Sequence, residues 1–505
     1  MTDRSLIIIG AGIGGLAAGC YAQMNGYRSQ IFEMHTLPGG VCTGWKRKGY
    51  TFDGCMHHLV GCAPDTRIHR MWQELGIMPR PVHFPDDLIG IESAEGRRLI
   101  VYTDLDRLEA HMRELAPADR GAIAEFVGAA RRFTRFSMMD MLLAKPWEMV
   151  TALPYMGLMG KWGKLTLEQV GAQFSDPFLR RAMGMIQYDF ANTPAVVALM
   201  FLSGCATRNF GWPAGGSIAF ARSIADRYEA LGGEIHYRAR VDKVLVERSP
   251  ETGQGIDRAV GVRLADGTEH RAGAIISNAD GRATILDMLD GRYTTERIRA
   301  FYDNPPKQQE MALHVSLGVA RDFADEPHML VLWLPEPVEI AGQTCDRLDI
   351  ELFAFAPEMA PPGKTAVQVV ATTSYDHWKA LSPEAYGAEK ARVAETVIAC
   401  LDRRFPGLRA QVEVVDVATP LTTERFTGSY QGYQAWPVPD QKMLDALMGK
   451  GLSKTLPGLD NFFMVGQWAG GIGLPNVAAM GRRAIADLCK QDGRRFRTLA
   501  RVSSN

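Results

Sequence analysis

Residues 5–15 read SLIIIGAGIGG, a β-branched run that leads directly into the pattern G-x-G-x-x-G. The run predicts a short buried parallel strand, and residues 16–24 predict the helix that follows it. Gly10 permits a tight turn, Gly12 lets the backbone approach a pyrophosphate, and Gly15 lets the helix pack closely against the strand. The N-terminus of this helix then offers free N–H groups and a positive dipole end to the phosphates.

A second expected strand, residues 28–32, ends at Glu33 and completes a strand–helix–strand unit. The spacing puts this carboxylate where it can accept hydrogen bonds from the ribose hydroxyls of a bound dinucleotide. An acid at this position fits an adenosine with a free 2′-hydroxyl, as in NAD or FAD, and disfavours NADP. The sequence therefore predicts an α/β protein with a Rossmann-type domain.

Composition sets the wider limits. The chain has 505 residues, enough for two or three packed units, and a hydrophobic content of 46% is ordinary for a globular protein. Lys and Arg number 56 against 57 Asp and Glu, so the formal net charge of -1 supplies no field for nucleic acid, and no such partner is expected. No apolar stretch is long enough to span a bilayer, which predicts a cytoplasmic protein, either soluble or peripheral on a membrane surface.

The eight cysteines form no C-x-x-C pair. A cluster of Cys42, Cys55, His57, His58 and Cys62 matches no usual zinc template, so no metal site is expected. The simpler interpretation is that the cysteines are small buried side chains in a reducing compartment. No second G-x-G-x-x-G is present, which argues against a separate NADPH-binding domain.

A second glycine-rich region narrows the choice of dinucleotide. LPGGVCTGW occupies residues 37–45, and GYTFDG occupies residues 49–54. Here the sequence resembles the large flavoprotein group that includes the amine oxidases and the phytoene desaturases. In that group a second glycine pair, here Gly39 and Gly40, passes close to the flavin, whereas NAD dehydrogenases lack it. The resemblance therefore implies FAD as the cofactor.

Further blocks resemble the same group and lie far apart in the sequence. WPAGG, residues 212–216, precedes an expected helix at 217–230, and residues 274–280 resemble the strand that returns to the flavin domain. Near the C-terminus, residues 461–467 resemble a strand that meets the cofactor, and residues 470–476 would open the last helix. The resemblance thus implies a discontinuous FAD-binding domain.

The resemblance also implies which residues contact FAD. The matching positions are Gly10, Gly12, Ile13, Gly14, Gly15, Glu33, Met34, Gly39, Gly40, Val41, Val244, Gly466, Gln467, Gly473, Leu474 and Val477. Val244 lies in residues 234–247, an expected strand pair, where the group holds the adenine. Gln467 departs from the pattern, because relatives commonly carry Asp or Glu there. Its amide keeps an acceptor oxygen, so cofactor binding should survive the change.

Within the group, Val41 and the segment Gly473-Leu474-Pro475 resemble the carotenoid isomerase and retinol saturase branch of the phytoene desaturase family. This branch implies an FAD-dependent oxidoreductase that exchanges a hydride between flavin N5 and a carbon of an apolar polyene or isoprenoid substrate. The outcome stays open among desaturation, saturation and cis–trans isomerisation, since all three share the same cofactor geometry.

Two other functions remain alternatives. Amine oxidases usually hold the substrate amine between two aromatic rings, one of them at the opening of the last helix, where this sequence has Leu474. Tyr433 or Trp436 could still line such a site. The second alternative is a flavin-free escort protein that binds isoprenoid tails, as the guanine-nucleotide dissociation inhibitors do. The intact glycine pattern argues against that class.

The remaining segments suggest how the chain is divided. We expect FAD-binding segments at 1–90, 203–285 and 456–490, a helical insertion at 105–202, a mixed β-sheet substrate domain at 286–455 and a basic tail at 491–505. Residues 136–162 are rich in methionine and favour either an adaptable helical core or an apolar face that admits a hydrophobic molecule or dips into a membrane. No pattern indicates an oligomeric state.

Candidate catalytic residues are few. His57 and His58 follow the turn at residues 52–54, which would place them near the flavin ring. A histidine there could donate or accept a proton, and the alternative is a histidine hydrogen-bonded within the flavin domain. Tyr433 is the third candidate.

Overall fold

The computed structural model describes residues 4–187, 193–248, 256–303, 311–433, 453–470 and 473–498. One layer is a sheet with strand order β10-β2-β1-β14-β21, in which every neighbouring pair is parallel. Its strands are β1 (Ser5–Ile9), β2 (Arg28–Glu33), β10 (Glu234–Tyr237), β14 (Ala274–Ser277) and β21 (Phe462–Met464). Because separate parts of the sequence supply these strands, the Rossmann-type domain is discontinuous, as predicted.

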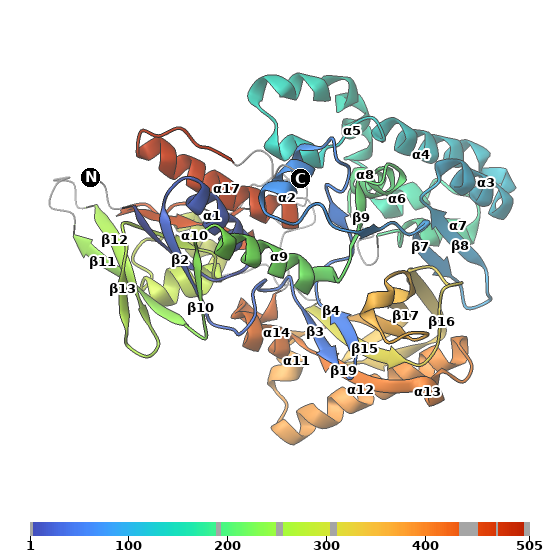
Figure 1. Cartoon of the computed structure of the whole chain (residues 1–505). Coiled ribbons are helices and arrows are strands. Elements are labelled where there is room, and N and C mark those ends of the chain that lie inside the picture. Colours follow the sequence, from blue (N-terminus) through green and yellow to red (C-terminus); the bar gives the residue numbers. More distant parts are fainter. Residues whose placement is uncertain are drawn as a thin grey trace.

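Helix α1 (Ile13–Met24) lies at the centre of this domain. It packs against β1 and β2 and also against α9 (Gly216–Ala230) and α17 (Leu474–Gln491), as Figure 1 shows on its left-hand side. A Cβ added to Gly15 would lie 2.2 Å from the carbonyl oxygen of Gly10. The close approach of helix and strand therefore depends on a glycine at position 15, which is the role that the sequence predicts for it.

An antiparallel sheet adjoins the parallel one. It consists of β11 (Val241–Arg248), β12 (Asp257–Leu264) and β13 (Glu269–Arg271), with β20 (Leu459–Asp460) pairing parallel to β12. The expected strand pair over residues 234–247 is therefore wrong in its pairing, because β10 and β11 belong to different sheets. The chain turns at Arg238, whose φ is +57°, and Ala239 N–H donates to the carbonyl oxygen of Glu33 at 2.8 Å. These contacts hold the linker on β2 and separate the two strands.

A larger mixed sheet fills the opposite half of the molecule, with strand order β19-β15-β18-β17-β16-β7-β8 (Figure 1). Its strands are β7 (Asp87–Glu92), β8 (Arg98–Tyr102), β15 (Met311–Val319), β16 (Met329–Ile340), β17 (Gln343–Leu352), β18 (Thr365–Thr373) and β19 (Val412–Ala418). Helix α12 (Pro383–Arg404) packs against it and buries Val393, Val397 and Leu401. Strands β7 and β8 precede the helical insertion, so the expected boundary at residue 90 falls within β7.

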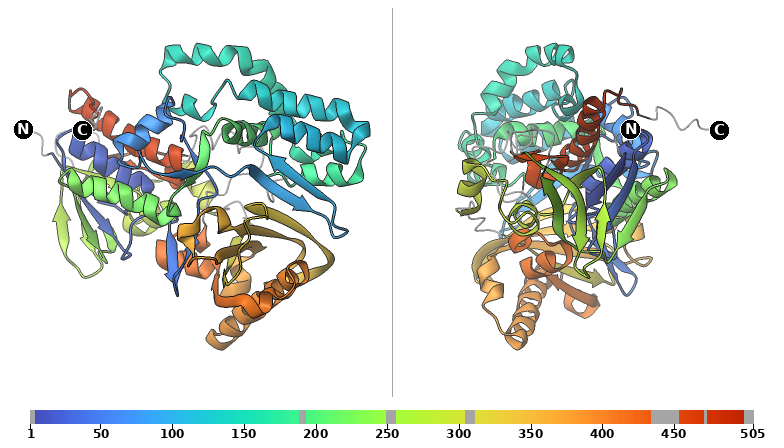
Figure 2. Two further views of the ribbon diagram at one scale, coloured as in Figure 1. Left: turned by 45° about the vertical axis from the view of Figure 1, so that its right-hand side comes forward. Right: turned by 90° about the vertical axis from the view of Figure 1, so that its left-hand side faces the viewer.

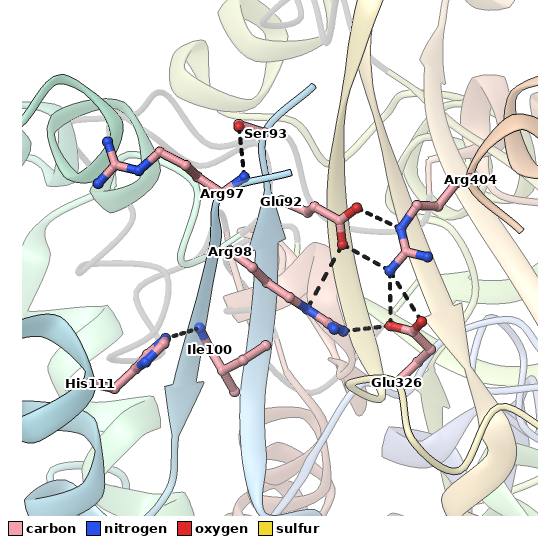
Figure 3. Close-up of polar contacts among 8 residues, drawn as sticks. All are labelled: Glu92, Ser93, Arg97, Arg98, Ile100, His111, Glu326 and Arg404. Atoms are coloured by element: carbon pink, nitrogen blue, oxygen red, sulfur yellow. Dashed lines mark hydrogen bonds and ion pairs between the residues drawn. The ribbon is translucent and has the colours of Figure 1, made fainter. Parts of the chain in front are cut away.

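An ion-pair network joins β7 and β8 to the end of α12 (Figure 3). The Arg404 guanidinium lies 2.5 Å from a carboxylate oxygen of Glu92 and 3.1 Å from one of Glu326. Arg98 contacts the same two carboxylates, Glu326 at 2.5 Å and Glu92 at 3.8 Å. Glu92 is buried, so these guanidinium groups compensate a carboxylate that water reaches poorly.

The helical insertion forms the top of the molecule in Figures 1 and 2. Its elements are α3 (Leu105–Leu115), η1 (Pro117–Asp119), α4 (Arg120–Phe133), η2 (Met139–Leu143), η3 (Pro146–Tyr155), α5 (Met156–Trp162), α6 (Leu167–Gly171), α7 (Pro177–Met183) and α8 (Ala195–Ala206). Pro117 and Pro177 open helical segments, where a missing N–H costs nothing. The expected helical insertion is present.

Short elements connect these layers. A β3–β4 hairpin follows the second glycine pair, and a small antiparallel sheet of order β5-β9-β6 contacts α8 and α9. Their bounds are β3 (Gly44–Arg47), β4 (Tyr50–Asp53), β5 (Leu59–Val60), β6 (Val82–His83) and β9 (Phe210–Pro213). The other elements are α2 (Arg67–Glu74), η4 (Ala283–Met288), α10 (Glu296–Asp303), η5 (Phe353–Phe355), η6 (Pro357–Met359), α11 (Tyr375–Lys379), α13 (Leu408–Gln411), α14 (Pro420–Thr427), η7 (Tyr430–Gly432) and α16 (Gln467–Gly470).

Candidate functional site

The G-x-G-x-x-G turn and the second glycine pair meet at the carboxyl end of β1. Gly12 and Gly39 form a parallel backbone bridge, and Gly39 N–H donates to the carbonyl oxygen of Ala11 at 2.8 Å. A Cβ added to Gly40 would lie 3.5 Å from the Cα of Gly12. Gly39 has φ +117°, a conformation that a residue with a side chain rarely adopts. The arrangement is a cradle of bare backbone at the edge of a parallel sheet, where α/β folds bind ligands.

Asn278 fills the centre of this cradle. Its side-chain oxygen would lie 2.6 Å from a Cβ added to Gly14 and 2.6 Å from one added to Gly466, and its nitrogen 2.5 Å from one added to Gly12. The backbone N–H of Asn278 donates to the carbonyl oxygen of Ile9 at 2.8 Å. Sequence reasoning placed Asn278 in a returning strand and did not include it among the site residues. Its place directly after β14, beside β1, was the signal that could have identified it.

Glu33 lies at the end of β2, as predicted, and is buried. One carboxylate oxygen accepts the N–H of Ala11 at 2.7 Å, and the other accepts the N–H of His35 at 2.8 Å. Burial raises the pKa of Glu33, and the two backbone donors act in the opposite direction. Each oxygen keeps a further lone pair, so the carboxylate can still accept a hydroxyl while it holds the glycine turn in place.

Two helices open at this edge, each with a glycine as its N-cap. The N-cap of α1 is Gly12 and that of α17 is Gly473, so neither N-cap residue has a side chain that bonds the first N–H groups. Val477, in the first turn of α17, has its carbonyl oxygen 3.2 Å from a Cβ added to Gly14. Ile13 is buried in the first turn of α1. Two positive helix ends therefore converge on one place, which suits an anionic ligand.

The remaining expected cofactor residues come from several elements of the fold. Val244 is buried in β11, and Val41, Leu474 and Gln467 are half-buried. The sulfur of Met34 lies 3.1 Å from a Cβ added to Gly428, so this side chain packs against the end of α14. Residues 471 and 472, in the expected opening of the last helix, lie outside the described residues.

His57 faces the mixed sheet. Its imidazole pairs with the buried carboxylate of Glu351 in β17, while 46% of its side chain remains exposed. Burial lowers the pKa of His57, but the charge and the hydrogen bond of Glu351, together with the nearby Cys55 and Asp53, outweigh that effect and raise the pKa to about 9. This histidine is therefore protonated at neutral pH and is bonded to the opposite domain, which differs from the expected alternative of a bond within the flavin domain.

His58 has the opposite character. Its Nδ1 contacts the carbonyl oxygen of His57, and its ring lies 5.7 Å from the ring of His328. Burial lowers the pKa of His58 to about 3, and the neighbouring imidazoles of His328 and His57 add to the shift. Two adjacent histidines thus hold different charges at neutral pH, which is the kind of pairing that supports separate acid and base roles.

Tyr433 is buried beside the short helix α16. Its ring stacks on that of Trp468 with centroids 6.2 Å apart at 29°, and it lies edge-on to Tyr430 at 5.9 Å. Trp436, the other aromatic candidate, lies outside the described residues. The aromatic rings therefore pack on each other next to Gln467.

Comparisons with known proteins agree with this geometry. Residues 8–75 match the family of NAD(P)-binding Rossmann-like domains. The chain is 26% identical over 456 residues to the chloroplastic prolycopene isomerase of Arabidopsis thaliana, which covers 84% of this chain and 73% of that protein. It is 24% identical over 449 residues to the neurosporene-forming phytoene desaturase of Cereibacter sphaeroides, covering 83% and 82%. The resemblance to phytoene desaturases and carotenoid isomerases is confirmed, and these proteins are homologues of the chain over most of its length.

A solved structure shows how widely the fold is shared. Putrescine oxidase bound to putrescine superimposes with a TM-score of 0.55 at 16% identity, covering 96% of this chain and 99% of that one. This likeness shows a common fold. The matched Rossmann-like domain supports a dinucleotide cofactor. Within the described part of the chain, no helix combines the length and the apolar character needed to cross a membrane.

Proposed function

We propose that this chain is an FAD-dependent oxidoreductase that acts on carbon–carbon bonds of an apolar polyene or isoprenoid substrate. The observation that carries the proposal is the backbone bridge between Gly12 and Gly39. This bridge joins the G-x-G-x-x-G turn to the second glycine pair at one edge of the parallel sheet. The homologues support the substrate class, because prolycopene and phytoene are long polyenes.

The cradle fits a dinucleotide that carries a flavin. In this proposal the N-terminus of α1 binds the pyrophosphate, Glu33 accepts from the ribose, and Val244 packs on the adenine. The second glycine pair and the first turn of α17 then approach the flavin ring, with Gln467 beside its ribityl chain. Bound FAD would supply the acceptance or donation of a hydride. The protein supplies orientation, exclusion of water and a positive helix end that favours negative charge on the ring.

An amine substrate fits the structure less well. Leu474, an aliphatic residue, stands at the opening of α17, and the aromatic pair of Tyr433 and Trp468 is stacked on itself. An amine cage needs two rings that face each other across a gap. The likeness to putrescine oxidase is a likeness of fold, so it carries no preference for amines.

Contact with a membrane surface is part of the proposal, because polyenes dissolve in lipid. Five large apolar side chains of the insertion are between 44% and 69% exposed, and they are Trp147, Met149, Val150, Leu153 and Met156. They share one segment, η3 and the start of α5, which forms the outer edge of the insertion in Figures 1 and 2. Such a patch on one protruding segment is typical of proteins that insert side chains into the interface of a bilayer.

The test begins with the purified protein, which should be yellow with non-covalent FAD. The bound FAD is then photoreduced without oxygen, and oxidised and reduced enzyme each receive carotenoids, retinoids, fatty acyl compounds and amines. We expect a changed double-bond pattern in a polyene with at least one redox state. Product from amines alone, with consumption of oxygen, would transfer the assignment to an amine oxidase. Colourless protein that cannot be reconstituted with FAD would contradict the proposal altogether.

A further inference from the structure

A small cavity lies where the Rossmann-type domain, the insertion and the mixed sheet meet. Its lining includes His58, Cys205 of α8, Trp212 of β9, His328 and Phe355. Its volume is about 20 Å³, enough for one group the size of a water molecule. Aromatic rings make up much of the lining, so a polar group that enters the cavity finds few hydrogen-bond partners.

Two buried nitrogen atoms of the lining residues have no hydrogen-bond partner within the described part of the chain. They are Nε1 of Trp212, whose residue is 2% exposed, and Nε2 of His328, whose residue is 7% exposed. A buried polar atom without a partner destabilises the protein, because it loses its bond to water and gains nothing in return. Both residues line the same cavity, so a polar group held there is a partner that could satisfy both atoms.

The chemistry of the pair defines that group. Nδ1 of His328 lies 2.8 Å from a carboxylate oxygen of Asp87, so Nδ1 carries the proton and Nε2 is an acceptor in the neutral ring. The indole of Trp212 can only donate. One donor and one acceptor match a hydroxyl, which accepts one hydrogen bond and donates another. A carbonyl or a carboxylate would leave Nε2 without a donor, and a hydrocarbon would leave both atoms unpaired.

We propose that the apolar substrate carries a hydroxyl group, which this cavity binds between Trp212 and His328. The inference rests on the proposed function and deepens it, since it makes the substrate a polyene or isoprenoid alcohol. His57, which follows the turn after β4, also lines the cavity. The hydroxyl end of the substrate would therefore lie beside that turn. An ordered water is the competing occupant.

The test compares substrates that differ by one hydroxyl. FAD-loaded protein is titrated with two matched pairs, lycopene with its 1-hydroxy-1,2-dihydro derivative and axerophthene with retinol, delivered in detergent micelles. Bound polyene is measured by its absorbance after gel filtration. In a pair that binds, we expect the hydroxylated member to bind at least fivefold more tightly than the hydrocarbon. This is the ratio of dissociation constants that one net hydrogen bond of about 1 kcal/mol gives. A smaller ratio would overturn the inference, with water as the occupant, and would leave polyene binding and the proposed function intact.

Two variants test whether the preference for a hydroxylated substrate arises in the cavity. Trp212→Phe removes the indole N–H and keeps an aromatic ring, and His328→Asn keeps a donor for Asp87 and removes the Nε2 acceptor. Each should reduce the hydroxyl preference, the ratio of the two affinities within one pair, to about twofold or less. Trp45→Phe is the matched control, because Nε1 of Trp45 is also buried without a partner in the described residues and Trp45 does not line the cavity. A preference that survives both cavity variants, or that Trp45→Phe also removes, would overturn the inference.

Since a variant could fail by unfolding, thermal unfolding is measured on each without substrate. Nε1 of Trp212 makes no bond within the described protein, so Trp212→Phe should unfold within about 2 °C of the wild type. A large loss of stability would show that the indole N–H has a structural partner, which also contradicts the inference.

Discussion

A Cβ atom added to Gly481 of α17 would lie 2.4 Å from the carbonyl oxygen of Gly14 in α1 and 2.6 Å from the backbone nitrogen of Ala18. The first and last helices of the Rossmann-type domain therefore touch backbone to backbone. This contact brings the N-terminus of α17 to the cradle that the first glycine pattern forms. Any side chain at position 481 must push the two helices apart.

Gly481→Ala is expected to destabilise the protein by about 1–3 kcal/mol, the usual effect of an added methyl group in a packed core. It should also reduce the FAD content, since displaced α17 no longer presents its N-terminus to the cradle. Thermal unfolding and flavin absorbance per protein measure the two effects. Gly128→Ala in α4 is the control, because a Cβ there meets nothing within 4 Å, and it should stabilise the helix by about 0.5–1 kcal/mol. Equal stability of the two variants would contradict the packing argument.

Gly12→Ala should separate cofactor binding from folding. The added Cβ meets the side chain of Asn278, which can rotate away, and Gly12 has an extended backbone conformation that alanine also adopts. We therefore expect a folded protein with a melting temperature close to that of the cofactor-free wild type. The methyl group occupies the place where the pyrophosphate approaches the backbone, so the protein should retain little FAD. Normal FAD content in this variant would exclude the proposed position of the pyrophosphate.

Local motifs account for what the sequence could predict. The strand, the glycine turn, the helix and Glu33 follow one another within 30 residues, and each has its own steric or electrostatic signature. The separation of β10 from β11 was not predictable in this way, because it depends on backbone bonds from residues 238 and 239 to residues 33–35. Asn278 and the partner of His57 were missed for the same reason, since each contact joins segments more than 180 residues apart.

Arg404→Met should reveal how much the ion-pair network contributes. The change leaves the carboxylate of Glu92 buried, with Arg98 at 3.8 Å as its remaining ion-pair partner among the described residues. Removing one partner of a buried ion pair usually costs about 3–5 kcal/mol, because the other charge stays uncompensated. Arg409→Met is the control, since its pair with Glu395 is exposed and should contribute at most about 1 kcal/mol. Denaturant unfolding measures the free energy of unfolding of both variants. Similar losses would show that the network contributes no more than an exposed ion pair.

The pair of His57 and Glu351 predicts a dependence of stability on pH. The folded pKa of about 9 exceeds the ordinary value of 6.5, so the pair stabilises the protein fully below pH 6.5 and loses this effect as pH rises through 9. His57→Gln should therefore lower the melting temperature at pH 6 and change it little above pH 9. His83→Gln, at a pair whose carboxylate, Glu358, is more exposed than Glu351, controls for loss of an imidazole. A difference between wild type and His57→Gln that stays constant across this range would contradict the assigned pKa.

The exposed segment of the insertion predicts binding to lipid. Trp147 is 69% exposed, and replacement of Trp147 and Leu153 by serine removes two of the largest apolar side chains from the outer edge. Each buried apolar side chain contributes about 1.5–3 kcal/mol on leaving water, so the double variant should bind phosphatidylcholine vesicles at least tenfold more weakly in sedimentation. Val415 and Phe426 are apolar residues with comparable exposure elsewhere, and their double serine variant should bind vesicles as the wild type does. Because neither pair lies in the cradle, FAD content should be equal in all three proteins. Vesicle binding that both double variants lose, or that neither loses, would show that this segment is not the lipid-binding surface.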